Sequence, residues 1–285
     1  MKYFIVDAFT DTPFGGNPAG VVFLGEKTPF PDEKLMQQVA AELRYSETAF
    51  VQQNGPAEFT VRYFTPCSEV DLCGHATIAT FGLLRREGII AEGSMCLNHT
   101  LAGDLKVKVN GHVMMQMAEP QVIVPLLDAD YLHEIMAGRR AMEKDWTDMP
   151  IEVISTGLPD IIMPVGNMET LNALKPDMDA LTELSRELNV VGVHAFAIGD
   201  DGYTAHVRDF APLYGVPEES ATGTANAALT YYLYRRNIIK HDEECQFMQG
   251  EAMERPSVVA TVLGTDGISW VGGQCAVVAS GELLI

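Results

Sequence analysis

Short runs of apolar or alternating residues, separated by glycine, proline and acidic turns, dominate the chain and predict a protein rich in β-strands. In the first half, strands are expected at 3–8, 20–24, 49–53, 59–65, 105–109 and 113–117. In the second half, they are expected at 151–156, 161–165, 192–198, 203–208, 246–249, 257–262, 267–271 and 276–279. Helical spacing with acidic residues near the start predicts surface helices over 32–44, 128–136 and 177–188. The pattern therefore indicates an α+β protein.

Two further helical segments, 76–84 and 224–234, carry no charged residue on any side. A helix without a polar face is normally enclosed, and small side chains let the surrounding strands approach closely. Each half of the chain is therefore predicted to wrap its strands around one central helix.

The two halves also share an ordered pair of motifs. Val-Arg-x-Phe-x-Pro occurs at 61–66 and again at 207–212, and each copy precedes an x-Gly-x-Ala sequence, at 73–76 and 222–225, that opens an uncharged helix. The connecting loop is longer by three residues in the second copy. The ordered match favours duplication over chance, and hence two domains of similar fold.

The length of 285 residues suits two such domains. We expect the first over 1–118 and the second over 119–274, with the final strand, about 275–285, packed on the first.

The charge balance limits the classes of partner that the chain is expected to bind. The chain has 19 Lys and Arg against 39 Asp and Glu, which gives a net charge of −20. Nucleic acid and anionic membrane surfaces require basic residues, so neither is an expected partner. The longest runs without Asp, Glu, Lys or Arg, 220–234 and 267–281, are too short for a membrane span. A small acid would have to be bound by local features of its site.

Five cysteines, an odd number without a Cys-x-x-Cys pair, indicate free thiols in a reducing compartment. We therefore expect a cytoplasmic protein.

The two x-Gly-x-Ala helix starts provide such a local feature. The first N–H groups of a helix lack internal partners, and glycine lets a ligand approach them closely. If the starts at Gly74 and Gly223 face each other across an interdomain cleft, they can bind an anion without a basic side chain. The alternative is that these glycines only permit tight turns into the helices.

Four candidate reactive groups lie near these starts. Glu47 precedes an apolar strand, Cys73 and His75 flank Gly74, and Glu218-Glu219 precede Thr222 by a few residues. Abstraction of a proton next to a carboxylate needs a base shielded from water, which Glu47 can provide. The alternatives are a solvated Glu47, a His75 bonded to backbone and a Cys73 that only packs in the core.

Metal and nucleotide sites are not predicted. Cys73 and His75 lie too close in sequence, and the other histidines and cysteines lack zinc-site spacing. The chain also lacks Gly-x-Gly-x-x-Gly and Gly-Lys-Ser/Thr sequences. We therefore expect no metal and no cofactor.

Taken together, these motifs resemble the PhzF-like proteins of phenazine biosynthesis over essentially the whole chain. The motifs that carry the resemblance are VDAFT at 6–10, FGGNPAGVV at 14–22, SETAF at 46–50, FTP at 64–66, CGHAT at 73–77 and ATGTA at 221–225. The family is similar in fold to diaminopimelate epimerase. The resemblance therefore implies two pseudo-symmetric domains, each a β-barrel around a central α-helix, with the active site in the cleft.

The resemblance also assigns roles to individual residues. It makes Glu47 the general base and acid of a proton shift, and it places His75 and Glu219 in the catalytic set. It implies that the substrate carboxylate is held by Ser46, Gly74, Gly223 and Thr224. Asn17 is a further substrate contact that it implies.

This chain departs from the family pattern at several of these positions. Glu219 stands where the family has Asp, Ser220 replaces Pro or a small apolar residue, and Thr224 replaces Ser. Epimerases of the wider superfamily use two cysteines, of which Cys73 matches the first and Thr222 replaces the second. The departure at Glu219 affects the substrate that the site accepts.

The resulting expectation is a cofactor-independent isomerase that moves a proton on a small carboxylic acid by way of Glu47. One alternative is an amino-acid racemase or epimerase that uses Cys73 and a second base. Another is a non-catalytic protein that binds small acids. By resemblance alone, a homodimer is expected.

Overall fold

The computed structural model describes residues 1–137 and 145–285. The chain forms two compact units: unit 1 comprises Met1–Gln116 and Gly272–Ile285, and unit 2 comprises Met117–Val271. Among the described residues, no helix has the length and apolar character needed to cross a membrane.

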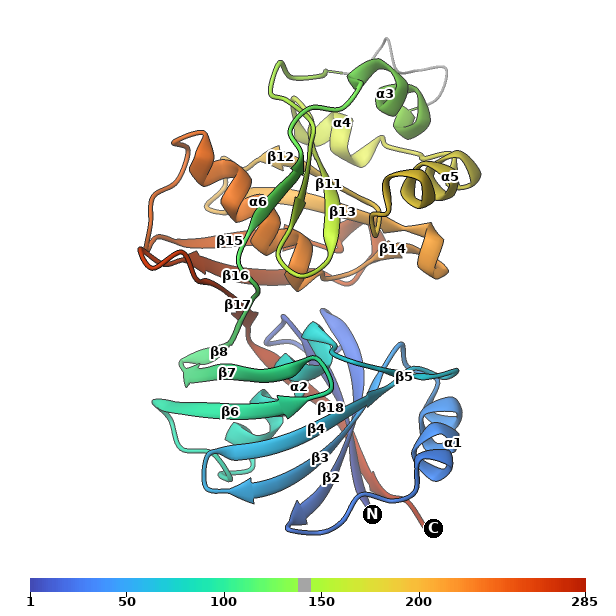
Figure 1. Ribbon diagram of the computed structural model, residues 1–285, viewed down its shortest axis with the longest axis vertical. Helices are drawn as coiled ribbons and strands as arrows, with labels where there is room; N and C mark the ends of the chain where they lie inside the picture. The colour runs from blue at the N-terminus through green and yellow to red at the C-terminus, as the bar shows by residue number, and fades with distance from the viewer. Residues whose placement is uncertain (138–144) are drawn as a thin grey trace. The chain divides into compact units, whose positions relative to one another are not determined.

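Unit 1 is a mixed sheet wrapped around one helix (Figure 1). Its elements are β1 (Lys2–Ala8), β2 (Asn17–Glu26), α1 (Glu33–Leu43), β3 (Thr48–Gly55), β4 (Glu58–Phe64), β5 (Glu69–Val70), α2 (Gly74–Arg86), β6 (Ser94–Thr100), β7 (Gly103–Asn110), β8 (His112–Gln116) and β18 (Cys275–Glu282). β1 lies between β18 and β2 and is antiparallel to both. The β2–β3 and β4–β6 pairs are parallel, and β3–β4, β6–β7 and β7–β8 are antiparallel.

The helix enclosed in unit 1 is α2. Every residue from His75 to Leu84 is buried, and the helix contacts β1, β2, β3, β7, β8 and β18. A Cβ atom at Gly82 would lie 2.1 Å from Sγ of Cys275, so the helix carries glycine where β18 crosses it. The absence of charge in this segment thus reflects its enclosure.

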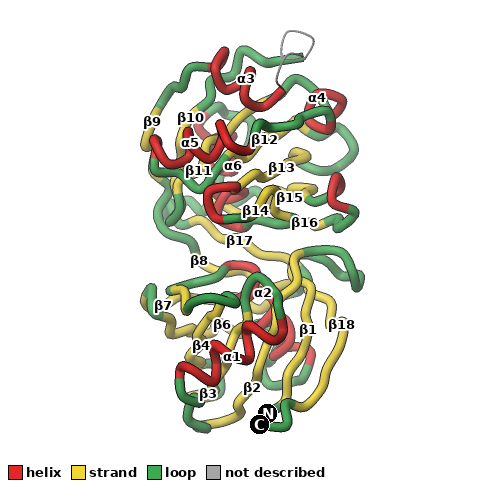
Figure 2. The backbone as a smooth tube through the Cα atoms, turned by 90° about the vertical axis from the view of Figure 1, so that its right-hand side faces the viewer, coloured by secondary structure: helices red, strands yellow, loops and turns green. Residues whose placement is uncertain are grey.

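Unit 2 repeats this plan with more surface helices (Figures 1 and 2). Its elements are β9 (Gln121–Val124), α3 (Ala129–Ala137), β10 (Glu152–Ser155), β11 (Pro159–Pro164), α4 (Met168–Asn172), α5 (Met178–Leu188), β12 (Val193–Ile198), β13 (Ala205–Ala211), β14 (Val216–Glu219), α6 (Gly223–Arg235), β15 (Glu244–Gln249), β16 (Ser257–Leu263) and the start of β17 (Ser269–Gly273). The β11–β12 and β13–β15 pairs are parallel; β12–β13 and β15–β16 are antiparallel.

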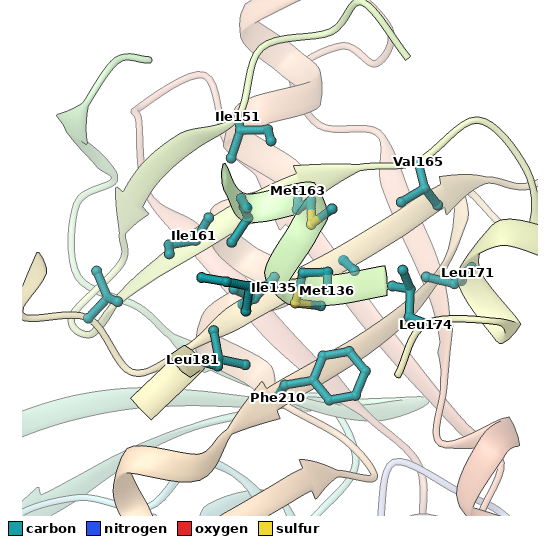
Figure 3. Packing of buried hydrophobic residues seen from close by; sticks show 14 of the residues in the cluster. Ile135, Met136, Ile151, Ile161, Met163, Val165, Leu171, Leu174, Leu181 and Phe210 are labelled. Carbon is teal, nitrogen blue, oxygen red and sulfur yellow. The ribbon is translucent and has the colours of Figure 1, made fainter. Parts of the chain in front are cut away.

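The central helix of unit 2 is α6, which is almost wholly buried and contacts β10, β11 and β16. The surface helices α3, α4 and α5 pack over β10, β11, β12 and β13 through a second apolar cluster. Figure 3 shows Ile135 and Met136 of α3 among Leu174, Leu181 and Phe210 within this cluster.

The strands and helices predicted from the sequence are present in the structure within a few residues of the expected ends. Sequence analysis missed β5, β6, β9, β14 and α4. The reason for β6 is its composition, because Ser94–Thr100 alternates polar and apolar residues too weakly to be distinguished from a loop. The other missed elements are five residues long or less.

Candidate functional site

Glu47 lies in the short connection between α1 and β3. Helix α1 ends where Arg44 adopts a left-handed conformation with φ 61°. The carbonyl of Glu47 then accepts a hydrogen bond of 3.1 Å from the N–H of Gly20. A Cβ at Gly20 would lie 2.7 Å from Oγ1 of Thr48, so glycine permits this close pairing. The backbone of Glu47 is therefore fixed at the start of β3.

Three side chains meet the ring of His75 at the start of α2. Oε2 of Glu47 lies 3.2 Å from Nε2 of His75, and Oγ of Ser46 lies 3.2 Å from the same nitrogen. Sγ of Cys73 lies 3.4 Å from Nδ1. The His75 side chain is 9% exposed and that of Glu47 is 19% exposed, so the carboxylate is shielded without being sealed from solvent.

Burial lowers the pKa of His75, and the neighbouring charge of Glu47 only partly offsets this effect. The imidazole is therefore neutral near pH 7 and has one N–H donor and one acceptor. Because a carboxylate only accepts, the favoured tautomer carries the proton on Nε2 and donates it to Glu47. Nδ1 then accepts from the thiol of Cys73, so the ring is held from both sides.

The N-terminus of α2 lies directly beside this cluster. Cys73 occupies the N-cap position but makes no side-chain capping bond. Among the described residues, the N–H groups of Gly74, His75 and Ala76 have no hydrogen-bond acceptor. Surface helices instead have capping side chains: Asp32 in α1, Asn167 in α4 and Asp177 in α5. The start of α2 is thus a set of unfulfilled donors that suits an anion.

Asn17 is buried at the start of β2, opposite Ala8 of β1. Since β2 and β3 are parallel, their first residues lie at the same edge of the sheet, which places Asn17 at the edge where Glu47 lies. The preceding turn needs Gly16, whose φ is +62° and whose Cβ would lie 2.1 Å from the carbonyl oxygen of Ala8. Its other anchor is Asp7, which accepts the Phe14 N–H at 2.7 Å.

In unit 2, the predicted residues gather around the start of α6. Glu219 ends β14 opposite Asp209, with a half-buried side chain, and its carbonyl accepts a bond of 3.0 Å from Nε2 of Gln249. Gly223 and Thr224 form the first turn of α6. The N-cap residue, Thr222, makes no side-chain capping bond, as at Cys73 in unit 1.

The structure thus brings the predicted residues together in two groups. Around His75 lie Ser46, Glu47, Cys73 and Gly74. Around the start of α6 lie Glu219, Gly223 and Thr224.

Sequence analysis missed a buried polar network behind the second group. Its members are His194, Asp209, Asn226 and Gln249, and Asp160 is buried near Asp209; each of the five is 2% exposed or less. The available signal was a charged or polar residue inside an apolar strand, as with Asp160 before Ile161-Ile162-Met163 and His194 within Val193–Ile198. Such residues are buried at a cost unless they are partnered, so they mark a network.

One group of side chains has metal-binding character. Donor atoms of Glu47, Cys73 and His75 lie within 4.8 Å of one another, and the described part of the chain holds no second such group of three. Carboxylate, thiolate and imidazole together suit a transition metal such as Zn²⁺. In this structure the same atoms pair with each other, and the expectation of a metal-free site stays a prediction.

Comparison with known proteins places this geometry in context. The family model described as "Phenazine biosynthesis-like protein" (PhzC-PhzF) matches residues 6–281. The "Uncharacterized isomerase YddE" of Escherichia coli K12 is 32% identical over 270 residues, which cover 92% of this chain and 86% of that protein. The "Trans-2,3-dihydro-3-hydroxyanthranilate isomerase" of Pseudomonas fluorescens is 30% identical over 269 residues, 90% of this chain and 88% of that protein.

Among solved structures, a PhzF-family phenazine biosynthesis protein of Bacillus anthracis superimposes with a TM-score of 0.87 at 28% identity, covering 100% of this chain and 99% of that chain.

Proposed function

The chain belongs to the phenazine biosynthesis-like (PhzC-PhzF) family and is an isomerase, and we propose that it moves a proton within a small carboxylic acid with Glu47 as the acid/base group. The observation that carries this proposal is the contact between the Glu47 carboxylate and the buried, neutral His75 at 3.2 Å. A shielded carboxylate in a fixed orientation is what proton abstraction next to a carboxylate requires.

In this mechanism the bond between hydrogen and one substrate carbon breaks, and the proton passes to a carboxylate oxygen of Glu47. The electron pair stays on the substrate and delocalises toward its carboxylate. A proton returned to a different carbon completes the isomerisation. No electrons leave the substrate, so the step is redox-neutral and needs no co-reactant.

His75 acts in this proposal as a positioning residue. Its Nε2–H holds one oxygen of Glu47, and its other nitrogen is held by Cys73, so the carboxylate keeps one orientation. Ser46 contacts the same imidazole nitrogen and is a proposed ligand of the substrate carboxylate. We assign Glu219 an orienting or relaying role and Asn17 a substrate contact.

The negative charge of the chain limits how a substrate carboxylate can be bound. With a net charge of −20, the field of the protein repels an anion, so local donors must hold it. The uncapped N–H groups at Gly74, and those at Gly223 and Thr224, are the proposed donors, supported by the helix dipole.

A first compound to test comes from the named relative. Trans-2,3-dihydro-3-hydroxyanthranilate is a small carboxylic acid, and a relative that carries its name is 30% identical to this chain. We propose it as the first member of a panel that also contains cyclic and amino-acid-like carboxylates.

The test is incorporation of deuterium from heavy water into the members of this panel. Glu47→Gln keeps the size of the side chain but removes the base, so turnover should fall by about 10³-fold or more while ligand binding measured by calorimetry is retained. Full activity of Glu47→Gln would exclude the proposal.

Cys73→Ala separates the isomerase from the epimerase alternative. If loss of the thiol abolishes exchange while Glu47→Gln does not, Cys73 is the base and the protein is an epimerase. If the wild-type protein binds members of the panel without labelling any, it is a binding protein instead. That it acts as a cytoplasmic homodimer stays a prediction.

A further inference from the structure

Three kinds of metal ligand meet in unit 1, from Glu47, Cys73 and His75. Their donor atoms all lie within 4.8 Å of one another. Oε2 of Glu47 is 3.2 Å from Nε2 of His75, and Sγ of Cys73 is 3.9 Å from the same nitrogen. All three residues belong to the segment Met1–Gln116, so the group is complete within a single compact unit.

The separations of these atoms are close to those between ligands of one tetrahedral zinc ion. Bonds of about 2.0–2.1 Å to nitrogen or oxygen and of about 2.3 Å to sulfur place a nitrogen about 3.3 Å from an oxygen and about 3.6 Å from a sulfur. The observed 3.2 and 3.9 Å differ from these values by a few tenths of an ångström. The sulfur and the carboxylate oxygen lie at most 4.8 Å apart, and rotation of two side chains closes the remaining distance of roughly 1 Å.

The donor set selects a transition metal over the hard cations. Thiolate and imidazole suit Zn²⁺ and its neighbours in the first transition row, whereas Mg²⁺ and Ca²⁺ require oxygen ligands. Two of the donors are anionic when bound, so they neutralise the charge of a divalent ion. The side chains of Glu47 and His75 are 19% and 9% exposed, so the group is not sealed from solvent. The net charge of −20 also favours the approach of a cation.

The repeated motif shows that this donor set is particular to unit 1. Thr222 and Thr224 stand where unit 1 has Cys73 and His75. A neutral hydroxyl replaces neither a thiolate nor an imidazole as a ligand of a transition metal. Because unit 2 forms its central helix with threonine at both positions, the fold itself does not require the thiol and the imidazole.

We propose that Zn²⁺ binds Glu47, Cys73 and His75 and thereby inhibits the isomerase reversibly. This inference rests on the proposed function, since the ion occupies the carboxylate that is assigned there to proton transfer. A carboxylate oxygen bound to a divalent cation is a weaker base, because the positive charge stabilises its ionised form. The metal therefore competes with the substrate proton for Glu47.

Binding exchanges a proton for the ion without any redox change. The thiol of Cys73 releases its proton to solvent and binds as the thiolate. The imidazole of His75 stays neutral, with its proton on Nδ1 in place of Nε2, and Nε2 donates its lone pair to the ion. Glu47 binds through one carboxylate oxygen. A water molecule is the fourth ligand, as in zinc sites with three protein ligands, and a chelator reverses the reaction.

The test is a titration of the whole protein with Co²⁺, which replaces Zn²⁺ and is coloured. Tetrahedral Co²⁺ bound to a thiolate gives visible d–d bands and a sulfur-to-cobalt charge-transfer band in the near ultraviolet. The wild type should show both, and added Zn²⁺ should abolish them. Cys73→Ala should lose the charge-transfer band and bind Zn²⁺ about 100-fold more weakly, because even the neighbours of a metal ligand contribute 10- to 100-fold to affinity.

Cys67→Ala is the matched control. It removes an exposed thiol of the same unit that belongs to no group of three donors in the described chain. It should keep the cobalt spectrum, the affinity for Zn²⁺ and the rate of the isomerase. Zn²⁺ should raise the melting temperature of the wild type and of Cys67→Ala but not that of Cys73→Ala, and melting without metal reports the folding of each variant. Loss of the charge-transfer band in Cys67→Ala, with the band retained in Cys73→Ala, would overturn the proposal.

Inhibition is measured in the deuterium assay, with the acid that the wild type labels fastest. Zn²⁺ should lower the rate with an inhibition constant that matches the dissociation constant from the titration, and EDTA should restore the rate. Mg²⁺ at the same concentration should have no effect. Stimulation by Zn²⁺, or equal inhibition by Mg²⁺, would overturn the inhibitory role.

The two proposals fail separately. Absence of the charge-transfer band in the wild type would exclude the metal site and leave the proposed function intact. If the band appears but the wild type labels no acid of the panel, the proposed function fails and the inhibitory role falls with it, whereas the metal site is established by the spectrum.

Discussion

Units 1 and 2 support the loop before their central helix with nearly the same ion pair. Arg62 binds Glu69 through two bonds of 2.6 Å, and Arg208 binds Glu218 through two bonds of 2.8 Å. The second partner lies three residues further along the chain, which is the length of the additional loop. In both units the arginine also lies over the phenylalanine that follows it in the motif. The repeated sequence therefore encodes a repeated ion pair that supports the loop before the central helix.

The side chains at the two helix starts, in contrast, differ in their chemistry. The helix start of unit 1 presents Cys73 and His75 to Glu47, whereas that of unit 2 presents Thr222 to Asp209. Neither N-cap residue caps its helix with its side chain. The backbone that exposes N–H donors is thus common to both units, whereas the side chains around it form a carboxylate–imidazole pair in unit 1 and a carboxylate–hydroxyl pair in unit 2.

Among the effects that compare the two units, the largest is expected from removing an N–H donor at a helix start. Proline is tolerated at the first helical position, and Cys73 and Thr222 have the extended backbone that proline requires before it. Gly74→Pro and Gly223→Pro should each weaken binding of the substrate carboxylate by roughly 10- to 100-fold, because each removes a hydrogen bond to a charged group. Calorimetry and KM measure this loss.

Gly74→Ala is the control for that prediction, since its Cβ would meet only Cε of Met115 at 3.8 Å. It keeps the N–H and should bind normally. Unchanged affinity in both proline variants would show that the helix starts do not hold the carboxylate.

A smaller effect is expected on stability, because the two ion pairs should contribute different amounts to the free energy of unfolding. Arg208 also donates to the carbonyls of Leu171 and Leu174, at 3.1 and 3.0 Å, and so connects β13 to the end of α4. Lysine cannot make these parallel bonds. Arg208→Lys should lower the free energy of unfolding by about 2 kcal/mol and Arg62→Lys by about 1 kcal/mol, measured by urea denaturation. Equal losses of unfolding free energy in the two variants would show that the bonds to α4 do not contribute to stability.

The smallest effect is expected in how the stability of the two units depends on pH. Burial lowers the pKa of His75 below its ordinary 6.5, so the unfolded chain takes up a proton first and unit 1 loses stability as the pH falls below that value. Burial also opposes the charge on His206 in unit 2, but hydrogen bonds to Glu251 and Asp201 outweigh it and raise its pKa. His206 therefore stabilises below pH 6.5, and this contribution is lost as the pH rises through its folded pKa.

Melting temperatures of His75→Asn and His206→Asn at acid and neutral pH check these signs. His206→Asn should lower the melting temperature more at acid pH than at neutral pH. His75→Asn should reduce the loss of melting temperature that the protein shows when the pH is lowered. The same pH response in both variants would contradict the assignment of opposite shifts.

The sequence predicted those features that depend on local pattern. Two uncharged segments predicted the enclosed helices α2 and α6, and short motifs singled out Glu47, Cys73 and His75, which the structure brings into contact. Their catalytic roles stay predictions.

The buried polar residues around Asp209 were not predictable in the same way, because they meet only through strand register. His194 faces Asp209 in the β12–β13 pair, and β11, which carries Asp160, lies beside β12. These residues are separated by 15 positions or more, and no local period places them on neighbouring strands.

The crossing of β18 over Gly82 has a consequence for biosynthesis. β1 pairs with β18 along its whole length, and the terminal amine of Met1 donates to the carbonyl of Leu283 at 2.9 Å. Unit 2 is continuous in sequence, so it has all its residues once position 271 has left the ribosome. Unit 1 lacks β18, the neighbour of β1, until residues 275–282 have been translated. Unit 1, which carries Glu47, is thus begun before unit 2 and completed after it, and the edge of β1 that pairs with β18 is the edge that needs protection in the interval.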